Sequence, residues 1–444
     1  MSELFNPLPK TNLPIFYKAR NEDVFLYAPG FMVCVEKPNW EKSLSASSEW
    51  QTLQTHAEKA NEQPCSWHDR FTPVSLNVYI TRSCNLHCRY CFSDPSQANP
   101  EYLAPSTESI IEGARLVAKN CSETGIPMTL VLNGGGEPTL DSRIVPLVSY
   151  VKELCNQENV PLFTYLATNG IMSTEKANKV CALFDLIGLS CDGPPEIQDL
   201  QRPTVGGGKS STIVERTVAI FHHNHQKFEA RVTLTKKSWP RMISIANYLV
   251  DKIHPQAINV ELAYRTPPFP INEEDLEKFI KCYFEAKDLC KEADIPWHSN
   301  SIRPGNHHRQ YCHILQNTLQ VIPGDIASMC FLDNDYLESS QRGTQIAVFD
   351  QDSKKWVINH TKITANRKIL IRDPEICKNC FISSHCHRSC PDICPLNHPK
   401  DLPDIHCKLN RRLFNDYLER SGNDLAVYCK EQQLTIAGKE IYEC

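Results

Sequence analysis

The stretch SLNVYITRSCNLHCRYC, residues 75–91, joins a short apolar run to three closely spaced cysteines. The run SLNVYI is typical of a buried β-strand, and Cys84, Cys88 and Cys91 follow on what we expect to be a loop. Three thiolates at this spacing can hold three irons of a cubane iron–sulfur cluster. No fourth cysteine is close by in sequence, so one iron stays open to another ligand. A zinc knuckle with His87 as its fourth ligand is the alternative.

Five further apolar runs alternate with helical patterns after this first strand. The runs are MTLVLN (128–133), LFTYLAT (162–168), LIGLSCD (186–192), ARVTLT (230–235) and INVELA (258–263). The helical patterns cover residues 107–121, 144–156, 174–184, 212–223, 242–253 and 273–293. This alternation predicts a parallel sheet covered by helices, and six units are too few for a closed eight-unit barrel. We therefore expect an α/β fold with a partial (β/α)6 barrel, whose ligands bind at the carboxyl ends of the strands.

Length and composition set the class of protein. The chain has 444 residues, of which 41% are hydrophobic and 22% charged, as in an ordinary globular protein with two or three domains. Its formal charge of −5 gives no support for nucleic-acid binding, which favours a clustered basic face. The first residues show no export signal, and no apolar run approaches the roughly eighteen residues that a membrane span needs. We expect a cytoplasmic protein with no membrane or nucleic-acid partner.

The 21 cysteines are the unusual feature of the composition. In a large chain without an export signal, reduced thiols that bind metal or clusters are favoured over disulfides. Several cysteines sit singly in helix-like segments, where a small buried hydrophobe is the simpler interpretation. Those are Cys121, Cys155, Cys181, Cys282 and Cys290.

The pattern divides the chain into four parts. Residues 1–70 form a small α+β segment, with a β-hairpin that turns at Pro29-Gly30 and a helix capped by Ser47 or Ser48. Residues 71–300 form the barrel. Residues 301–410 are rich in cysteine and predicted to be mostly irregular, and residues 411–444 are a short helix and a polar tail.

The motif CNLHCRYC resembles the cysteine motif of the radical S-adenosylmethionine (SAM) superfamily. In that family the amino and carboxylate groups of SAM chelate the open iron, and an aromatic residue before the last cysteine lies near the adenine; Tyr90 occupies that position. The resemblance implies a 4Fe–4S cluster, SAM, and reductive cleavage of SAM to a 5′-deoxyadenosyl radical that abstracts hydrogen from a substrate. No protein side chain can do this chemistry, so the cofactor carries it.

Later strand ends match the same family in the same order. Gly135, Gly136 and Glu137 match its Gly-Gly-Glu motif, which contacts the amino group of SAM, and glycines let a backbone approach a ligand closely. Ser190 and Asp192 resemble its Ser-x-Asp-Gly-Pro strand end, where the serine and the acidic residue lie near the cofactor.

Two arginines follow that strand end. Arg202 and Arg231 are candidate partners for the carboxylate of SAM, because a guanidinium binds carboxylates with two parallel hydrogen bonds. Each is equally consistent with an ordinary surface ion pair.

The cysteines after residue 300 resemble the SPASM extension, a seven-cysteine domain of peptide- and protein-modifying radical enzymes. In it two auxiliary 4Fe–4S clusters share an interleaved set of ligands. The resemblance assigns the outer cluster to Cys377, Cys380, Cys386 and Cys407, and the inner cluster to Cys312, Cys330 and Cys390. Zinc is the alternative for the dense array between residues 377 and 390 taken alone.

Two departures from the SPASM pattern concern the inner cluster. Gly324 and Cys330 are separated by five residues where the family usually has four, and Thr318 stands where sulfatase-maturating relatives have an extra cysteine. The inner cluster then keeps an open iron or takes a further ligand from His308, His313 or Cys394.

The SPASM resemblance implies a peptide or protein substrate, and we predict a maturase that modifies a ribosomally made peptide with electrons from a flavodoxin or ferredoxin. Asp333 and His313 are the candidate catalytic residues, by their proximity to the inner cysteines. The nearest rival is an anaerobic sulfatase-type maturase, which oxidises a cysteine or serine to formylglycine. That group places an aspartate directly after its second SPASM cysteine, where this chain has Phe331.

Two other classes stay open. One is a small-molecule dehydrogenase. The other is a non-catalytic iron–sulfur protein that transfers electrons or senses redox state, which would not need the glycine–glutamate turn. For residues 1–70, docking of a leader peptide and a purely structural cap are the two interpretations.

Overall fold

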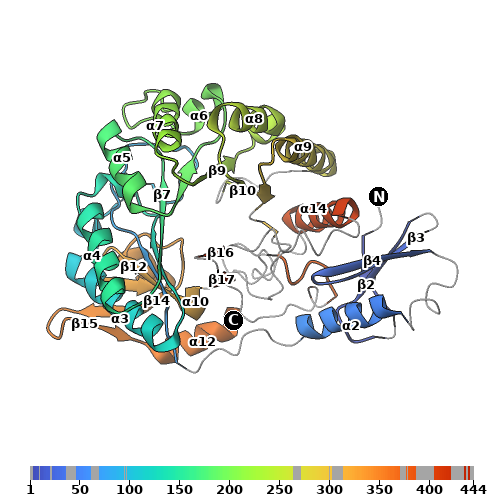
Figure 1. The fold of residues 1–444 in the computed structure, drawn as a ribbon, viewed down its shortest axis with the longest axis horizontal. Helices are drawn as coiled ribbons and strands as arrows, with labels where there is room; N and C mark the ends of the chain where they lie inside the picture. The colour runs from blue at the N-terminus through green and yellow to red at the C-terminus, as the bar shows by residue number, and fades with distance from the viewer. Residues whose placement is uncertain are drawn as a thin grey trace.

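A computed structural model gives the fold. The described residues are 4–9, 11–20, 23–36, 47–61, 70–94, 96, 98–263, 272–299, 301–302, 314–370, 377, 379–386, 405–421, 435–436 and 439–440. Figure 1 shows a large, open α/β crescent on one side and a small sheet near the N-terminus on the other, with helix α14 (Ile405–Ser421) between them.

The main sheet runs in the order β11-β10-β9-β8-β7-β6-β5-β12-β13-β14-β15 over the described part of the chain. From β5 to β11 every neighbouring pair is parallel. These strands are β5 (Ser75–Val78), β6 (Met128–Leu132), β7 (Leu162–Thr168), β8 (Leu186–Ser190), β9 (Phe228–Leu234), β10 (Ile258–Leu262) and β11 (Trp297–Ser299). The six predicted strands are confirmed, and β11, with three residues, is a seventh that the sequence did not reveal.

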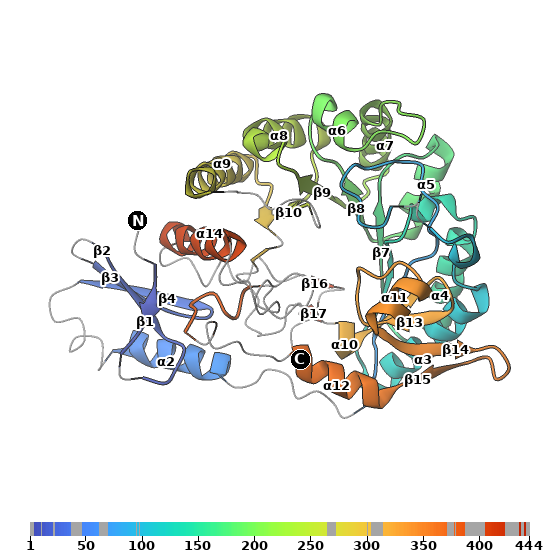
Figure 2. The ribbon, with the colours of Figure 1, turned by 180° about the vertical axis from the view of Figure 1, so that it is seen from behind.

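Helices cover the outer side of this sheet (Figures 1 and 2). They are α3 (Thr107–Thr124), α4 (Ile144–Gln157), α5 (Thr174–Leu183), α7 (Ser211–His223), α8 (Met242–Tyr248) and α9 (Glu273–Glu292). All six match predicted helices, although α8 continues as a π-helical turn over Leu249–Ile253. A short helix, α6 (Pro195–Gln201), was not predicted and follows the end of β8.

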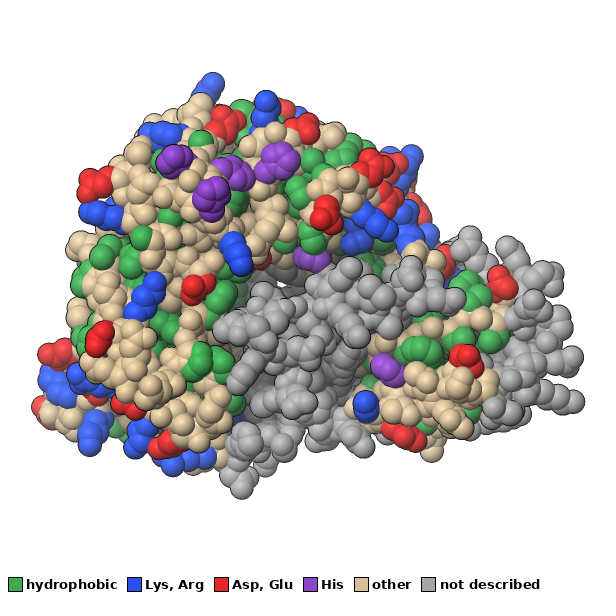
Figure 3. Space-filling view, viewed as in Figure 1, with side chains coloured by type: hydrophobic (Ala, Val, Ile, Leu, Met, Phe, Trp, Pro, Cys, Tyr) green, Lys and Arg blue, Asp and Glu red, His purple; other side chains and the backbone are tan. Residues whose placement is uncertain are grey.

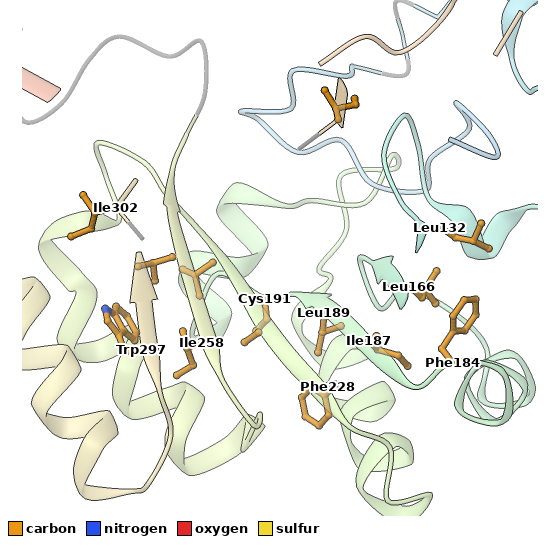
Figure 4. Close-up of a cluster of buried hydrophobic side chains, with 14 of the residues drawn as sticks. Leu132, Leu166, Phe184, Ile187, Leu189, Cys191, Phe228, Ile258, Trp297 and Ile302 are labelled. Carbon is orange, nitrogen blue, oxygen red and sulfur yellow. The ribbon is translucent and has the colours of Figure 1, made fainter. Parts of the chain in front are cut away.

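The alternation of side chains along the strands gives the sheet one apolar face and one more polar face. In β9, Phe228, Ala230 and Val232 are buried, whereas Glu229 and Arg231 between them are partly exposed. Figure 4 shows part of the apolar layer, with Leu166, Ile187, Leu189 and Phe228 on neighbouring strands. Each such buried side chain contributes about 1.5–3 kcal/mol. The apolar faces therefore hold the helices, and the polar faces line the inside.

The sheet continues past residue 300. β12 (Thr318–Ile322) pairs in parallel with β5, and β13 (Ile326–Ser328), β14 (Gln345–Asp350) and β15 (Lys355–Ile358) add antiparallel strands. Helices α10 (Ile314–Asn317), α11 (Tyr336–Arg342) and α12 (His360–Leu370) complete this part. The region predicted as mostly irregular is thus regular over residues 314–370. Runs such as TLQVI carry strand propensity that the cysteine spacing does not reveal.

The N-terminal part is a four-stranded antiparallel sheet with one helix. It consists of β1 (Asn6–Pro7), β2 (Phe16–Arg20), β3 (Asp23–Ala28), β4 (Phe31–Glu36) and α2 (Ser48–Asn61). The predicted turn at Pro29-Gly30 is confirmed, with Gly30 at φ 89°. Ser47 caps α2, since its Oγ accepts a hydrogen bond from Trp50 N at 3.2 Å.

This small sheet is fastened to the C-terminal part. The ammonium of Lys18 donates to Asn415 Oδ1 at 3.0 Å and pairs with Glu419, both on α14. The Tyr27 hydroxyl and His385 Nε2 share a hydrogen bond in the buried contact beside them. A last ladder, β16 (Thr435–Ile436) with β17 (Lys439–Glu440), lies near the C-terminus.

The surface shows no single-sign field on the side seen in Figure 3, where basic and acidic side chains of the described residues are interspersed. No described helix has the length and apolar character required to cross a bilayer.

Candidate cluster and cofactor site

The cysteine loop lies at the carboxyl end of β5, as predicted, and is held against the segment that follows α6. His87 N donates to Pro203 O at 2.8 Å, and Arg89 N donates to Gln201 O at 3.0 Å. These backbone bonds fix both halves of the loop 84–91 to the end of α6 and the residues after it, which follow β8, three strands along the sheet from β5. The loop is therefore positioned by the barrel and not by its own sequence alone.

The three thiols of this loop lie partly buried and close enough to influence one another. The pKa of Cys84 is raised to about 11 and that of Cys88 to about 12, mainly by burial, and the charge of Cys91 contributes to both rises. Cys84 Sγ also accepts weak hydrogen bonds from Leu86 N (3.5 Å) and Asn169 Nδ2 (3.8 Å). A thiol that is hard to ionise alone is stabilised as a thiolate by iron. The donor set thus fits three irons of one cluster.

These thiols are not arranged around a single ion. Among the described residues, no three His, Cys, Asp or Glu side chains lie close enough to hold one metal ion together. A cubane cluster does not require this, because each cysteine binds a different iron.

The glycine turn after β6 lies directly on the start of the cysteine loop. Gly134 and Gly135 have φ values of 66° and 70°, which only glycine adopts easily. A Cβ at Gly136 would lie 2.2 Å from the carbonyl oxygen of Ser83. Glu137 N donates to the same oxygen at 2.8 Å. The glycines of the predicted motif therefore let its backbone come into direct contact with the start of the cysteine loop.

The carboxylate of Glu137 is buried and its oxygens are occupied by the chain. Oε1 accepts from the hydroxyls of Thr139 and Thr168, both at 2.7 Å, and Oε2 accepts from Asn169 N at 2.7 Å. The side chain of Asn169 in turn donates to Asn85 Oδ1 at 2.8 Å. Glu137 thus ties the ends of β6 and β7 to the cysteine loop, and its contact with SAM stays a prediction.

Asp192, Tyr90 and Arg202 form one buried unit beneath the loop. Asp192 is fully buried and accepts from the Tyr90 hydroxyl at 2.6 Å, Gln201 Nε2 at 2.7 Å and Thr233 N at 2.9 Å. Arg202 places Nε and Nη2 each 3.0 Å from the two carboxylate oxygens. Its guanidinium also lies 5.2 Å from the centre of the Tyr90 ring. Arg202 is therefore not a surface ion pair.

The positive charge of Arg202 acts on the cluster loop. It opposes the rise that burial causes in the pKa of Cys88, and so favours the thiolate that binds iron. Arg202 is 7% exposed. The structure thus brings together Tyr90, Asp192 and Cys88 around one guanidinium, three residues that the sequence assigned separately.

Ser190 and Arg231 are direct neighbours across β8 and β9. Arg231 is only loosely paired, 4.0 Å from Glu261 Oε2, with about a third of its side chain exposed. Beside it, Glu229 accepts from the Tyr165 hydroxyl and from Asn259 Nδ2, each at 2.8 Å.

Sequence reasoning missed Tyr165, Glu229 and Asn259, which line the same polar inner wall. The signal that could have found them is the alternation of polar residues at 229, 231 and 233 in an otherwise apolar strand.

The part of the chain after residue 328 brings Asp333 next to Cys330. Asp333 is fully buried and accepts from the hydroxyls of Ser328 and Thr344 and from Arg342 Nη1, the last at 2.6 Å. An enclosed, ion-paired carboxylate anchors structure and is poorly placed to accept a proton from a substrate. These contacts do not support the predicted catalytic role of Asp333.

Three of the predicted outer-cluster cysteines lie on one short stretch of turns, and the fourth, Cys407, lies on α14, which contacts that stretch. Cys380 N donates to Cys377 O at 3.1 Å in a chain of tight turns that ends at Cys386. Asn410 of α14 donates to Cys386 Sγ at 3.6 Å, and Cys407 precedes Asn410 by one helical turn on the same face. The donor set fits a cluster between the turn and the helix. The other predicted ligands and base, Cys312, Cys390, His308, His313 and Cys394, lie outside the described residues.

A buried ion pair joins the cysteine loop to the segment after Cys330. Arg82 pairs with Asp335, and the two side chains are only 2% and 4% exposed. Nearby, the Ser93 hydroxyl donates to Asn334 Oδ1 at 2.6 Å. Arg82 and Ser93, which flank the cysteine loop, thus both contact a segment next to a predicted auxiliary ligand.

The sequence model of the Radical SAM superfamily matches residues 78–235, which contain the cysteine loop and the strand ends described above. The chain contains a radical SAM domain. Radical SAM enzymes bind a 4Fe–4S cluster and SAM, and Cys84, Cys88 and Cys91 are the cysteines of this domain that match the family motif.

Two curated proteins are similar to part of this chain. A cysteine-type anaerobic sulfatase-maturating enzyme of Clostridium perfringens is 27% identical over 185 residues, which are 40% of this chain and 49% of that protein. A GTP 3′,8-cyclase of Limosilactobacillus fermentum is 24% identical over 226 residues, 50% of this chain and 63% of that protein. The chain thus spans about half of the first relative's length and somewhat more of the second's.

Solved structures share the fold over most of the chain. The structure of anSMEcpe with bound AdoMet has a TM-score of 0.59 at 20% identity, covering 81% of this chain and 100% of that one. Streptococcus suis SuiB bound to its precursor peptide SuiA has a TM-score of 0.54 at 14% identity, covering 90% and 99%. At these identities the likeness concerns the fold.

Proposed function

We propose that this chain is a radical SAM maturase that abstracts hydrogen from a ribosomally made peptide and so installs a post-translational modification. The observation that carries the proposal is the loop of Cys84, Cys88 and Cys91, held at the carboxyl ends of the barrel strands beside a buried Tyr90–Asp192–Arg202 unit. When bound, the cluster and SAM supply an electron and a 5′-deoxyadenosyl radical.

The chain's own residues have holding and excluding roles in this proposal. The three cysteines hold the cluster, Arg202 favours the thiolate of Cys88, and Gly136 keeps the second strand end in contact with the loop. Ser190 and Arg231 are the residues on the inner wall that we assign to SAM. An open barrel with a polar inner face leaves room for a substrate at the same end.

The peptide substrate is supported by the second cysteine region and by the fold. We assign an outer auxiliary cluster to Cys377, Cys380, Cys386 and Cys407, supported by the turns that carry the first three and by the contact of α14 with Cys386. Two proteins of similar fold have been solved with peptides, anSMEcpe with the Cp18Cys peptide (TM-score 0.56) and SuiB with SuiA. We assign the electron supply to a flavodoxin or ferredoxin.

A sulfatase-type maturase is the second candidate, favoured by the 27% identity to a cysteine-type anaerobic sulfatase-maturating enzyme. Phe331 stands where that group has its aspartate, and Asp333 is enclosed by three donors. We therefore rank formylglycine formation below modification of a ribosomal peptide.

Anaerobic reconstitution with iron and sulfide tests the proposal. The reconstituted chain with SAM and dithionite is expected to form 5′-deoxyadenosine, and a Cys84→Ala/Cys88→Ala/Cys91→Ala variant is expected to form none. Auxiliary clusters add to the roughly four irons of one cluster, giving about eight to twelve per chain. Full iron loading without 5′-deoxyadenosine would favour a non-catalytic cluster protein.

Mass spectrometry of a candidate peptide separates the enzymatic alternatives. A short peptide encoded beside the gene is incubated with the reconstituted enzyme. A crosslink removes two hydrogens, whereas formylglycine formation changes one cysteine or serine to an aldehyde. Turnover of a sulfatase-derived peptide alone would overturn the first choice in favour of the second.

A further inference from the structure

An arginine lies on the sulfur of Cys330. Arg342 Nη2 donates to Cys330 Sγ at 3.4 Å, while Nη1 of the same guanidinium donates to Asp333 Oδ1 at 2.6 Å. One planar group therefore bridges a thiol and a carboxylate. The cysteine motifs do not identify this residue, because it lies twelve positions after Cys330 and on another element.

The position of Arg342 is fixed from both sides. It is the last residue of α11, which Gly343 terminates at φ 68°. Its anchor, Asp333, is fully buried and held in turn by the hydroxyls of Ser328 and Thr344. The guanidinium cannot leave the sulfur by simple rotation without leaving a buried carboxylate poorly paired.

The backbone of Cys330 is held as firmly as the arginine. Its N–H donates to Ser328 Oγ at 3.0 Å, and its carbonyl oxygen accepts from Gln320 Nε2 at 2.9 Å. Ser328 thus contacts both Cys330 and Asp333. The thiol and its cationic neighbour are presented as one preformed unit.

We propose that Arg342 positions the iron–sulfur cluster bound by Cys330 and raises its reduction potential. This rests on the auxiliary clusters of the proposed function. Hydrogen bonds to cysteine sulfur withdraw charge from a cluster, and a nearby cation favours the more negative, reduced state. Because a guanidinium stays charged at every accessible pH, the contribution does not depend on pH. Arg342 acts through Cys330, so it is a positioning residue.

The test is a redox titration of the full-length, anaerobically reconstituted protein, followed by electron paramagnetic resonance. Arg342→Gln removes the charge, and Arg342→Lys keeps it without the two-pronged fork. Arg241→Gln is the matched control, since Arg241 forms an exposed ion pair with Glu196. Iron per chain and far-UV circular dichroism are measured for each variant.

We expect the midpoint potential of one auxiliary signal to fall in Arg342→Gln, to fall less in Arg342→Lys, and to stay unchanged in the control. Loss of about four irons per chain in Arg342→Gln, with an intact fold and the other signals unchanged, also supports the proposal. If Arg342→Gln does not fold, the midpoint potential of the Arg342→Lys protein tests the proposal instead. An unchanged midpoint in any fully loaded Arg342 variant overturns it.

The outcome for the wild-type protein separates this inference from the proposed function. Iron near the four atoms of one cluster per wild-type chain would remove the auxiliary clusters and the role of Arg342 together. A normal iron content and normal SAM cleavage, with an unchanged midpoint in the variants, would remove only the role of Arg342.

Discussion

Three buried carboxylates, those of Glu137, Asp192 and Asp333, have their oxygens occupied by donors of the chain itself. In the sequence, each of them lies in or next to a motif that we assigned to cofactor or cluster binding. In the structure each connects segments that must stay together, either two strand ends or a strand and a loop. A buried carboxylate is retained only with such donors, because an unpaired one is costly. These residues therefore hold the segments of the site together as well as lying next to it.

Asp192 gives a prediction at the scale of a residue. Asp192→Ala leaves the buried guanidinium of Arg202 unpaired, so we expect a loss of about 3–5 kcal/mol in the free energy of unfolding, measured with urea. Glu196→Ala is the control, because its pair with Arg241 is exposed and contributes about 0–1 kcal/mol. Equal losses of unfolding free energy in the two variants would show that the buried pair stabilises the fold no more than the exposed pair does.

At the scale of an element, strand β8 depends on having no side chain at one position. A Cβ on Gly188 would lie 1.9 Å from Tyr165 Oη and 3.1 Å from Arg231 Cδ. The Tyr165 side chain crosses the strand there and reaches Glu229 on β9. Gly188 thus lets three strands share one polar cluster on the inner wall.

Gly188→Ala is expected to lower the free energy of unfolding by about 1–3 kcal/mol, because the added methyl group displaces Tyr165 from Glu229. Gly113→Ala in α3 is the matched control. Its new Cβ meets its nearest neighbours at 3.4 Å, an ordinary contact, and alanine favours a helix by about 0.5–1 kcal/mol. A stable Gly188→Ala protein would mean that the Tyr165 contact is dispensable.

The short strand β11 gives a prediction on pH. Burial lowers the pKa of His298 from 6.5 to about 4, with a smaller contribution from the charge of Lys287. Between these two values the unfolded chain binds more protons than the folded one, so stability is lost as pH falls from 6.5 to about 4. The melting temperature of His298→Gln is expected to fall less over this interval. Parallel curves for the two proteins would contradict the prediction.

At the scale of the whole molecule, the contact of Arg82 with Asp335 joins the cluster loop to the antiparallel end of the sheet. The N-terminal sheet is joined in the same manner to α14 through Lys18 and Glu419. Residues near the two ends of the chain thus lie against one another. The parts named from sequence are linked by buried polar contacts and not only by the chain.

Asp335 has two roles that substitution can separate. Asp335→Ala leaves Arg82 without its buried partner and removes the cap of α11, in which Asp335 Oδ1 accepts from Glu338 N at 3.1 Å. We expect losses of about 3–5 kcal/mol for the pair and about 1 kcal/mol for the cap. Asp335→Asn keeps a capping oxygen and is expected to lose only the first part. Urea unfolding measures both, and an Asp335→Asn protein as stable as wild type would disprove the ion-pair role.

The sequence by itself determined six of the seven parallel strands described from β5 to β11, the six long helices that cover them and the cysteine motifs, because hydrophobic periodicity and residue spacing are local properties. Only the tertiary structure decided which strands pair and which distant side chains contact one another. It paired β12 with β5, so that Asn77 meets Gln320 across 243 residues, and it enclosed Asp333 and placed Arg342 on Cys330. It also made Arg202 the buried partner of Asp192. Such choices depend on which distant side chains share a buried volume, and no local pattern contains that information.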